Sequence, residues 1–306
     1  MIPYARQDIN QDDIDAVVEV LQSDWITQGP VIEKFENCIK DYCGAKHAIA
    51  VCNGTAALHL ACLAMGLGKG DILWTSPNTF VASANCALYC DANVDFVDID
   101  PRTYNLSVKK LEEKFVEAKK ANKLPKVLVA VHFAGQSCDM EQISRLAKKY
   151  SVRVIEDASH AIGGDYNLHK IGSGRYSDIT VFSFHPVKII TTGEGGILLT
   201  NDQQLANSIK LLRTHGITRE TDQLESEADG SWYYEQQSLG YNYRITDIQA
   251  ALGLSQMKRI DDFIQRRQEL ATRYDAELAG MGLTLPFREQ DRLSAMHLYV
   301  VRIPVN

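Results

Sequence analysis

The chain has 306 residues, of which 45% are hydrophobic and 23% are charged, a composition typical of a globular enzyme with a sizeable core. The formal net charge is −7 at neutral pH and no block of Lys and Arg stands out, so we expect no nucleic-acid partner. No run of about 18 apolar residues occurs, and the first residues are too polar and acidic for a signal peptide. These features predict a cytoplasmic protein that does not associate with a membrane.

The cysteines give no sign of a metal centre or a disulfide framework. They form no CxxC pair and no Cys/His spacing of a metal site, and most lie in apolar segments, which favours reduced, partly buried thiols. We therefore expect no bound metal. The seven cysteines are Cys38, Cys43, Cys52, Cys62, Cys86, Cys90 and Cys138.

Short β-rich runs alternate with helical patterns from residue 47 to residue 200. This alternation predicts an α/β fold with a mainly parallel central sheet, in which the ends of the strands are the place to look for chemistry. Asp139 is a candidate cap for the helix after it. The expected strands are 47–52, 71–77, 94–100, 126–133, 152–157, 178–184 and 196–200, and the expected helices include 55–68, 82–90, 108–122 and 140–150.

The pattern changes after residue 244. Residues 246–280 read as one long amphipathic helix with Thr246 as its N-cap and Gly280 as its C-cap, and residues 297–305 read as a strand. We therefore predict a large domain over residues 1–244 and a smaller C-terminal α+β domain over residues 245–306.

Lys188 is the most informative residue of the chain. It follows the predicted strand 178–184 within SFHPVKIITTGEGG, and Asp157 ends the apolar run VRVIED before it. A pyridoxal phosphate (PLP) site needs an amine that forms a Schiff base with the aldehyde, an acid facing the ring nitrogen and donors for the phosphate. Lys188, Asp157 and the hydroxyl of Ser183 are residues of these three kinds.

A second segment offers a place for the phosphate. HAIAVCNGTAALHLACLAMG reads as a strand, a turn and a helix, so Gly54, Thr55 and Ala56 fall at a helix N-terminus, where free N–H groups favour an anion. An ordinary turn and cap explains the same residues equally well. The interpretation as a phosphate site gains weight only when it is combined with Lys188.

Several neighbouring residues have both a functional and a structural interpretation. Asp157 either faces a pyridine nitrogen or caps the next helix, and His160 either reaches the phenolic oxygen of the ring or packs in the core. Phe80 offers a face for ring stacking, although most phenylalanines are core residues. Asn242 and Arg244 lie on a loop, where polar residues are solvated unless a ligand is near. The sequence suggests no role for Glu194.

Taken together, the motifs resemble the sugar aminotransferases of the DegT/DnrJ/EryC1/StrS family, a branch of the fold-type-I PLP-dependent transferases. The likeness runs along essentially the whole chain, in the order expected of that family. Its blocks are SDWITQGP, NGTAALHLA, SPNTFVASAN, EDASHAIG, SFHPVKIITTGEGG, LLRTHGITR and GYNYRITDIQAALGLSQ.

The resemblance implies roles for individual residues. Lys188 would hold the cofactor as a Schiff base, Asp157 would face the pyridine nitrogen and His160 would lie near the phenolic oxygen. The resemblance further implies that Thr55, Ala56 and Ser183 hold the phosphate, next to Gly54 at the same helix N-terminus, and that Phe80 stacks on the ring. It also implies that Asn242 reaches the cofactor phosphate of a neighbouring subunit, in a homodimer with shared active sites. Arg213, His215 and Arg244 would lie on the nucleotide-sugar side.

The resemblance also implies the reaction. L-glutamate would donate an amino group to the C4 keto carbon of a UDP-linked 4-keto-6-deoxy sugar. Residues 2–30 resemble the branch that acts on UDP-2-acetamido-2,6-dideoxy-β-L-arabino-hex-4-ulose in pseudaminic acid or related surface-glycan biosynthesis. Members of the family usually continue beyond this point, so we expect the small domain to be incomplete.

Other functions remain as alternatives. The acceptor could be another nucleotide-linked 4-keto sugar, and a non-catalytic PLP-binding regulatory protein would share many of the motifs, although the intact Lys188 and Asp157 argue against it. A sugar dehydratase of this family would carry histidine in place of Lys188. A Rossmann dehydrogenase is disfavoured because no GxGxxG follows the first strand.

Overall fold

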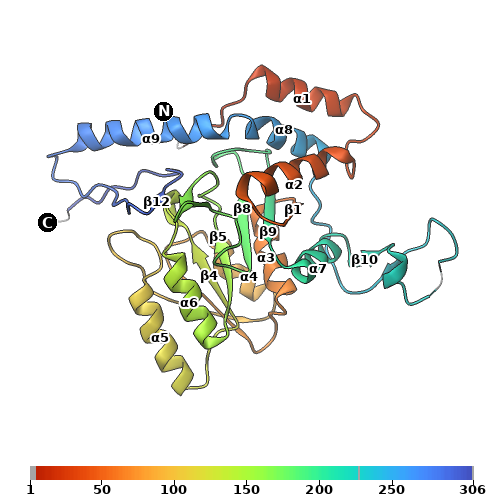
Figure 1. Ribbon diagram of the computed structural model, residues 1–306, viewed down its shortest axis with the longest axis horizontal. Coiled ribbons are helices and arrows are strands. Elements are labelled where there is room, and N and C mark those ends of the chain that lie inside the picture. The colour runs from red at the N-terminus through yellow and green to blue at the C-terminus, as the bar shows by residue number, and fades with distance from the viewer. Residues whose placement is uncertain (1–4, 227, 305–306) are drawn as a thin grey trace.

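A seven-stranded sheet forms the centre of the molecule in the computed structural model, which describes residues 5–226 and 228–304 (Figure 1). All seven strands predicted from residues 47–200 are present. In spatial order they are β1 (His47–Val51), β9 (Gly196–Thr200), β8 (Ile179–Ser183), β5 (Arg153–Asp157), β4 (Val127–Val131), β2 (Ile72–Thr75) and β3 (Asn93–Phe96).

The sheet is mainly parallel, as predicted. Strands β3, β2, β4, β5 and β8 run parallel to one another, whereas β9 and β1 are paired antiparallel at one side. The register pairs Ser183, the last residue of β8, with Gly196, the first residue of β9. The carboxyl ends of β5 and β8 therefore share one edge of the sheet with the start of β9, and this edge carries the site.

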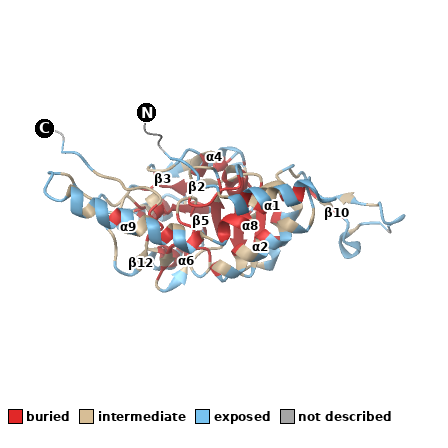
Figure 2. Ribbon diagram, turned by 90° about the horizontal axis from the view of Figure 1, so that it is seen from above, coloured by how far each residue is buried: buried red, intermediate tan, exposed pale blue. Residues whose placement is uncertain are grey.

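Helices cover both faces of the sheet. Alternate strand residues point to opposite faces, so Val127, Val129 and Val131 of β4 pack in a cluster with α3, α4 and α7, whereas Leu128 and Ala130 pack in a cluster with α5 and α6. Figure 2 shows this buried core in red between exposed outer helix surfaces. The helices are α1 (Gln11–Leu21), α2 (Pro30–Cys43), α3 (Gly54–Ala64), α4 (Ala82–Leu88), α5 (Val108–Lys120), α6 (Met140–Tyr150), α7 (Gln203–Arg213), α8 (Asp247–Met257) and α9 (Ile260–Leu278), with short 3-10 turns η1 (Phe133–Gly135) and η2 (Thr221–Gln223).

Two of the predicted helix caps are confirmed. The Asp139 side chain accepts a hydrogen bond from the backbone N–H of Gln142 and begins α6. Thr246 begins α8 with a reciprocal pair of hydrogen bonds, since its hydroxyl accepts from the Gln249 N–H and the Gln249 side chain accepts from the Thr246 N–H.

The single helix predicted over residues 246–280 is wrong, because the structure divides it into α8 and α9. Arg259 lies at the break with φ −114° and ψ 8°, and its guanidinium forms ion pairs with Asp8 and Asp13. These ion pairs with the N-terminal segment stabilise Arg259 in a backbone conformation that a continuous helix does not have. The C-cap is Ala279 rather than Gly280, which follows it with φ +78°.

The strand predicted over residues 297–305 is also wrong for its described residues, 297–304, where only Arg302 forms a bridge, with Thr284. The N–H groups of His297 and Leu298 instead donate to Ala134 O in η1. Residue 305 lies outside the described residues. A small sheet not predicted from the sequence lies nearby, with the strand order β12 (Arg292–Leu293), β6 (Asp165–Tyr166) and β7 (His169–Lys170).

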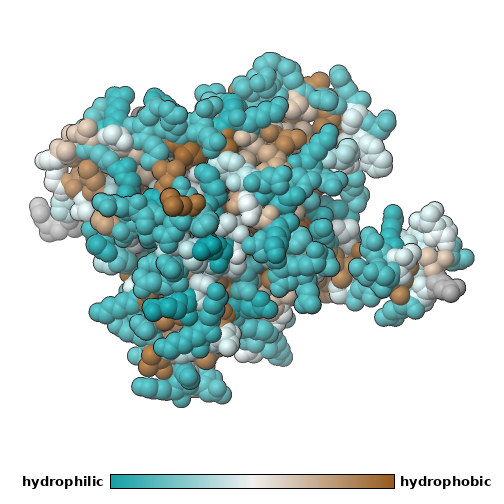
Figure 3. Space-filling model, viewed as in Figure 1, coloured by the Kyte–Doolittle hydropathy of each residue, from teal (hydrophilic) through white to brown (hydrophobic). Residues whose placement is uncertain are grey.

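The outer surface has two distinct features. A hairpin of β10 (Ile217–Thr218) and β11 (Glu235–Gln236) extends away from the body, with Trp232 and Tyr234 exposed (Figure 1). Apolar side chains show between α1 and α2 on an otherwise mostly hydrophilic face (Figure 3). Among the described residues, no helix combines the length and apolar character that a membrane crossing requires.

Candidate active site

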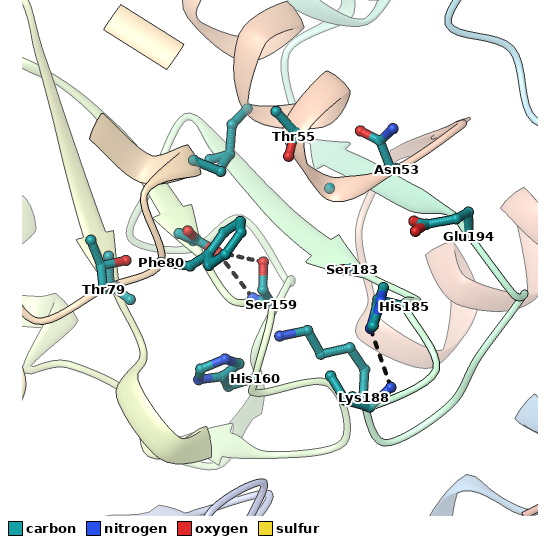
Figure 4. Close-up of a pocket in the computed structure, with 16 residues that line it drawn as sticks. Asn53, Thr55, Thr79, Phe80, Ser159, His160, Ser183, His185, Lys188 and Glu194 are labelled. Carbon is teal, nitrogen blue, oxygen red and sulfur yellow. Dashed lines mark hydrogen bonds between the residues drawn. The ribbon is translucent and has the colours of Figure 1, made fainter. Parts of the chain in front are cut away.

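A cavity of about 400 Å³ lies at the carboxyl edge of the sheet (Figure 4). It brings together seven residues that the sequence singled out for the cofactor: Gly54, Thr55, Phe80, Asp157, His160, Ser183 and Lys188. The other lining residues are Asn53, Leu58, Thr79, Ala82, Val131, Ser159, His185, Val187 and Glu194. Residues far apart in the chain therefore meet where the parallel strands end.

Lys188 lies on the loop between β8 and β9. Its backbone N–H donates to His185 O at 2.8 Å, and its side chain extends across the cavity toward His160 and Ser159 (Figure 4). Burial lowers the pKa of the Lys188 amine, while the negative charge of Asp157 acts in the opposite direction. A larger fraction of this amine is therefore unprotonated and nucleophilic than for a surface lysine.

Asp157 is only 5% exposed and is held by hydroxyl groups on both carboxylate oxygens. Ser83 Oγ in α4 donates to Oδ2 at 2.6 Å, and Ser159 Oγ donates to Oδ1 at 2.6 Å. The helix-cap interpretation does not hold, because the element that follows Asp157 is the short strand β6. Asp157 therefore presents a fixed carboxylate to the cavity.

His160 lines the same cavity and packs against a second imidazole. The centroids of the His160 and His297 rings are 4.3 Å apart, and both Nδ1 atoms are buried without a hydrogen-bond partner among the described residues. Burial and the charge of Lys188 lower the pKa of His160 to about 4, although Asp157 opposes this change. His160 is thus neutral at physiological pH.

The N-terminus of α3 forms one wall of the cavity. Asn53 Oδ1 accepts from the Ala56 N–H at 2.8 Å, so the N–H groups of Gly54 and Thr55 are the ones that a first helical turn leaves for a ligand. Ala56 therefore takes part in the cap and does not line the cavity. A Cβ on Gly54 would lie 2.9 Å from Ser183 Cβ, so glycine permits the close approach of the two phosphate-site residues.

Phe80 is 70% exposed, which excludes the core interpretation for this residue. It lies just before the N-cap of α4 and borders the cavity (Figure 4). An aromatic ring in this position can cover a planar ligand.

Besides Ala56, four residues predicted for the site lie outside the cavity of their own chain. Arg213 forms an ion pair with Glu36 and donates to Ala50 O, so it joins α7, α2 and β1. His215 and Asn242 are exposed, and Arg244 is half-buried. The structure of one chain thus gives these residues no contact with the cavity.

Four residues at or near the cavity were not predicted to contribute. Ser83 and Ser159 hold Asp157, His297 packs on His160, and the Glu194 carboxylate faces the cavity from the loop before β9 (Figure 4). Ser159 could have been found from its position two residues after Asp157, where a hydroxyl can reach back to the carboxylate. The other three carry no local signal.

Residues 7–306 match the family model described as the DegT/DnrJ/EryC1/StrS aminotransferase family. The chain belongs to this family. The family description names aminotransferases, and this chain carries Lys188 where the dehydratases of the family have histidine, so the protein is a PLP-dependent sugar aminotransferase.

Proteins with several different names are similar to this chain in sequence. It is 43% identical over 303 residues to the spore coat polysaccharide biosynthesis protein SpsC of Bacillus subtilis, covering 99% of this chain and 76% of that protein. It is 41% identical over 302 residues to the UDP-4-amino-4,6-dideoxy-N-acetyl-beta-L-altrosamine transaminase of Campylobacter jejuni, covering 98% and 76%. The chain thus spans about three quarters of the length of each relative.

A solved structure has the same fold. The putative sugar aminotransferase Spr1654 of Streptococcus pneumoniae in its PMP form superposes with a TM-score of 0.89 at 29% identity, covering 99% of this chain and 79% of that one. PMP is the aminated form of the cofactor, so this neighbour binds the same group that the family requires.

The residues around the cavity fit PLP. A lysine amine, an anchored carboxylate and free N–H groups at a helix N-terminus are the three kinds of group that the aldehyde, the ring nitrogen and the phosphate require. The buried, unpartnered Nδ1 of His160 adds a polar atom that a ligand could satisfy. Besides Asp157, the lining carries one further carboxylate, that of Glu194.

Proposed function

We propose that this enzyme transfers the amino group of L-glutamate to the C4 keto carbon of a UDP-linked 4-keto-6-deoxy sugar. The observation that carries the proposal is the meeting of Lys188 and Asp157 in one cavity with the N-terminus of α3. The acceptor that we propose is UDP-2-acetamido-2,6-dideoxy-β-L-arabino-hex-4-ulose, in pseudaminic acid or related surface-glycan biosynthesis. The similarity to the altrosamine transaminase of C. jejuni supports this choice.

In this proposal each residue acts on one part of the cofactor. Gly54, Thr55 and Ser183 hold the phosphate, and Asp157 faces the ring nitrogen. When bound, PLP supplies an electrophilic carbonyl and a ring that withdraws electrons. Lys188 Nζ would hold the cofactor covalently and, when the amino group of glutamate takes its place, would be free to take and return a proton in both halves of the transfer.

The proposal includes a homodimer in which Asn242 of one subunit completes the site of the other. Asn242 is exposed and lies outside the cavity of its own chain, which fits a role toward another chain. Arg213, His215 and Arg244 lie outside the same cavity, and their proposed place is the nucleotide-sugar side. Because the proposed donor and acceptor are charged metabolites that do not cross membranes unaided, we place the reaction in the cytoplasm.

A direct assay tests the reaction and the acceptor. PLP-loaded enzyme is incubated with L-glutamate and, in parallel, with UDP-linked and GDP-linked 4-keto-6-deoxy sugars, and the amino sugars are measured by mass and by NMR of the C4 configuration. We expect amination of the UDP-linked sugar in preference to the GDP-linked one. Preferential amination of the GDP-linked sugar would overturn the proposed acceptor, and failure to aminate any sugar would overturn the proposed reaction.

A lysine variant tests whether Lys188 anchors the cofactor and carries the proton. Lys188→Ala should lose the visible absorption of the PLP-loaded enzyme and lower turnover by about 10²-fold or more, because anchor and proton carrier are removed together. Lys109→Ala is the matched control, since Lys109 is exposed on α5. An unchanged visible band in Lys188→Ala would contradict the assignment.

A further inference from the structure

The segment after β12 is fastened to the edge of the cavity from two sides. The N–H of Ala295 donates to Gly135 O at 2.9 Å and the N–H of His297 donates to Ala134 O at 2.9 Å, so the segment is bonded to the turn after β4. From the other side, Arg267 in α9 donates to the carbonyl oxygen of Met296 at 3.2 Å. These bonds fix the backbone that carries the His297 ring.

The His297 ring covers His160. The two ring planes are inclined by 36° with their centroids 4.3 Å apart, a distance of direct packing. Phe133 lies on the His160 ring at a longer centroid distance of 6.4 Å. His160 is thus enclosed between the turn after β4 and the C-terminal segment, with its remaining side open to the cavity.

The charged groups around the pair disfavour a positive imidazole. His160 faces Lys188, which lowers its pKa, and Asp157, which raises it. His297 faces His160, Lys188 and Arg267 with no carboxylate, and burial together with these neighbours lowers its pKa to about 2. At neutral pH both rings are therefore uncharged, and the His297 ring acts through packing and exclusion of water.

We propose that His297 is a positioning residue of the aminotransferase site, whose ring keeps His160 dry and fixed beside Lys188. A neutral His160 adds no positive charge next to the amine of Lys188, and an orientation held by packing keeps one ring nitrogen directed at the cavity. The consequence for catalysis rests on the proposed function. The packing and the charge state are properties of the protein without substrate and are testable separately.

The first measurement follows His160 by NMR in protein labelled with ¹⁵N-histidine, and the resonance that disappears in His160→Gln identifies the residue. We expect the wild-type His160 to titrate with a midpoint near 4. His297→Ala should raise this midpoint by about one unit or more, because water reaches the ring. His297→Phe keeps the covering ring and should keep the midpoint low.

Controls separate a local effect from a general one. His169→Ala removes an exposed histidine on β7 and should leave the midpoint of His160 unchanged. Because His297→Ala could destabilise the chain, His297→Gln serves as a second variant without an aromatic ring, and circular dichroism establishes that each protein is folded. An unchanged midpoint in a folded His297→Ala or His297→Gln protein would overturn the proposal.

The second measurement uses the PLP-loaded enzyme and the pH dependence of its reaction with L-glutamate. We expect the acid limb of the kcat profile to move to higher pH in His297→Ala and to return in His297→Phe, with little change in KM. A profile that does not move while the His160 midpoint does would overturn the catalytic consequence. If neither the wild-type enzyme nor any variant reacts with glutamate, the proposed function fails. The NMR measurement still decides whether His297 protects His160 by packing.

Discussion

Asp157 is fixed by residues from two different elements. Ser83 approaches from α4 and Ser159 from the turn after β5, and each donates a hydroxyl to a different carboxylate oxygen. Hydrogen bonds to a charged acceptor are short and strong, and both distances are 2.6 Å. The carboxylate therefore has one orientation before any ligand binds, which favours a role toward a ring nitrogen that enters later.

The first prediction at this scale concerns the charge of Asp157. Asp157→Asn keeps the shape but removes the anion that would keep the ring nitrogen protonated, so we expect turnover to fall by about 10²-fold or more while PLP still binds. Steady-state rates and PLP titration measure the two effects. Ser83→Ala, which keeps the charge and removes one hydroxyl, is the comparison and should lose less activity. Turnover close to wild type in Asp157→Asn would return the residue to a structural role.

Single residues differ in how far the sequence predicts them. Asp157 ends one predicted strand and Lys188 closely follows the end of another. Parallel topology brings such ends together, so their meeting follows from the pattern. Ser83 lies 74 residues from Asp157, on a helix whose rotation about its axis no local pattern determines. His297 lies in a segment that the pattern predicts to be a strand, so its contact with His160 depends on a fold that the pattern does not predict.

At the scale of elements, a buried polar cluster joins β4 to β5 and β8. Glu156 of β5 points away from Asp157, because neighbouring strand residues face opposite sides. Its carboxylate accepts from His132 Nε2 at 2.7 Å, from Ser177 Oγ at 2.5 Å and from Thr180 Oγ1 at 3.3 Å. Burial alone would raise the pKa of Glu156, but His132 and the two hydroxyls lower it overall.

This cluster predicts a pH-dependent part of the stability. Because the pKa of Glu156 is lower in the folded state than in the unfolded state, its contribution is present above the unfolded pKa and is lost as pH falls through the folded pKa. Glu156→Gln should therefore destabilise the protein at pH 7 by about 2 kcal/mol. Because Glu156 also helps to raise the pKa of His132 to about 10, the difference should persist as pH falls from 7 and should shrink only below the unfolded pKa of Glu156, 4.5. Thermal unfolding of both proteins from pH 7 to pH 4 measures it. A difference that already shrinks between pH 7 and about pH 5, or that keeps growing below pH 4.5, would contradict the assignment.

The boundaries of the elements show where local patterns stop being sufficient. The apolar periodicity continues through residues 246–280, yet the chain breaks at Arg259 because Asp8 and Asp13, from the other end of the sequence, pair with its guanidinium. The segment after Met296 carries β-forming residues, yet its N–H groups find Ala134 O instead of a neighbouring strand. In both places a tertiary contact overrides a correct local propensity.

At the scale of the whole molecule, helices from distant parts of the chain pack on one another. Helix α8 packs on α1 and α2, and Gly253 allows the contact because a Cβ there would lie 2.8 Å from the Phe35 ring. The division into domains at residues 244 and 245 stays a prediction. The single chain encloses Lys188 and Asp157 in one cavity but leaves Asn242 exposed and Phe80 largely uncovered.

That arrangement leads to a prediction about subunits. In a symmetric dimer with shared sites, Lys188 of one subunit works with Asn242 of the other. Lys188→Ala and Asn242→Ala should each be inactive alone. When the two proteins are mixed and allowed to exchange subunits, half of the dimers are mixed and each of these has one intact site, so activity should return to about a quarter of wild type.

The matched control mixes Lys188→Ala with Asp157→Asn. Both residues line one cavity within one chain, so no mixed dimer contains an intact site and no activity should return. Differently tagged subunits and native mass spectrometry show that exchange has taken place. If activity returns in the mixture of Lys188→Ala with Asn242→Ala but not in the mixture of Lys188→Ala with Asp157→Asn, Asn242 acts in the site of the partner subunit. If neither mixture recovers activity although mixed dimers are present, Asn242 acts within its own chain and the shared-site proposal is wrong.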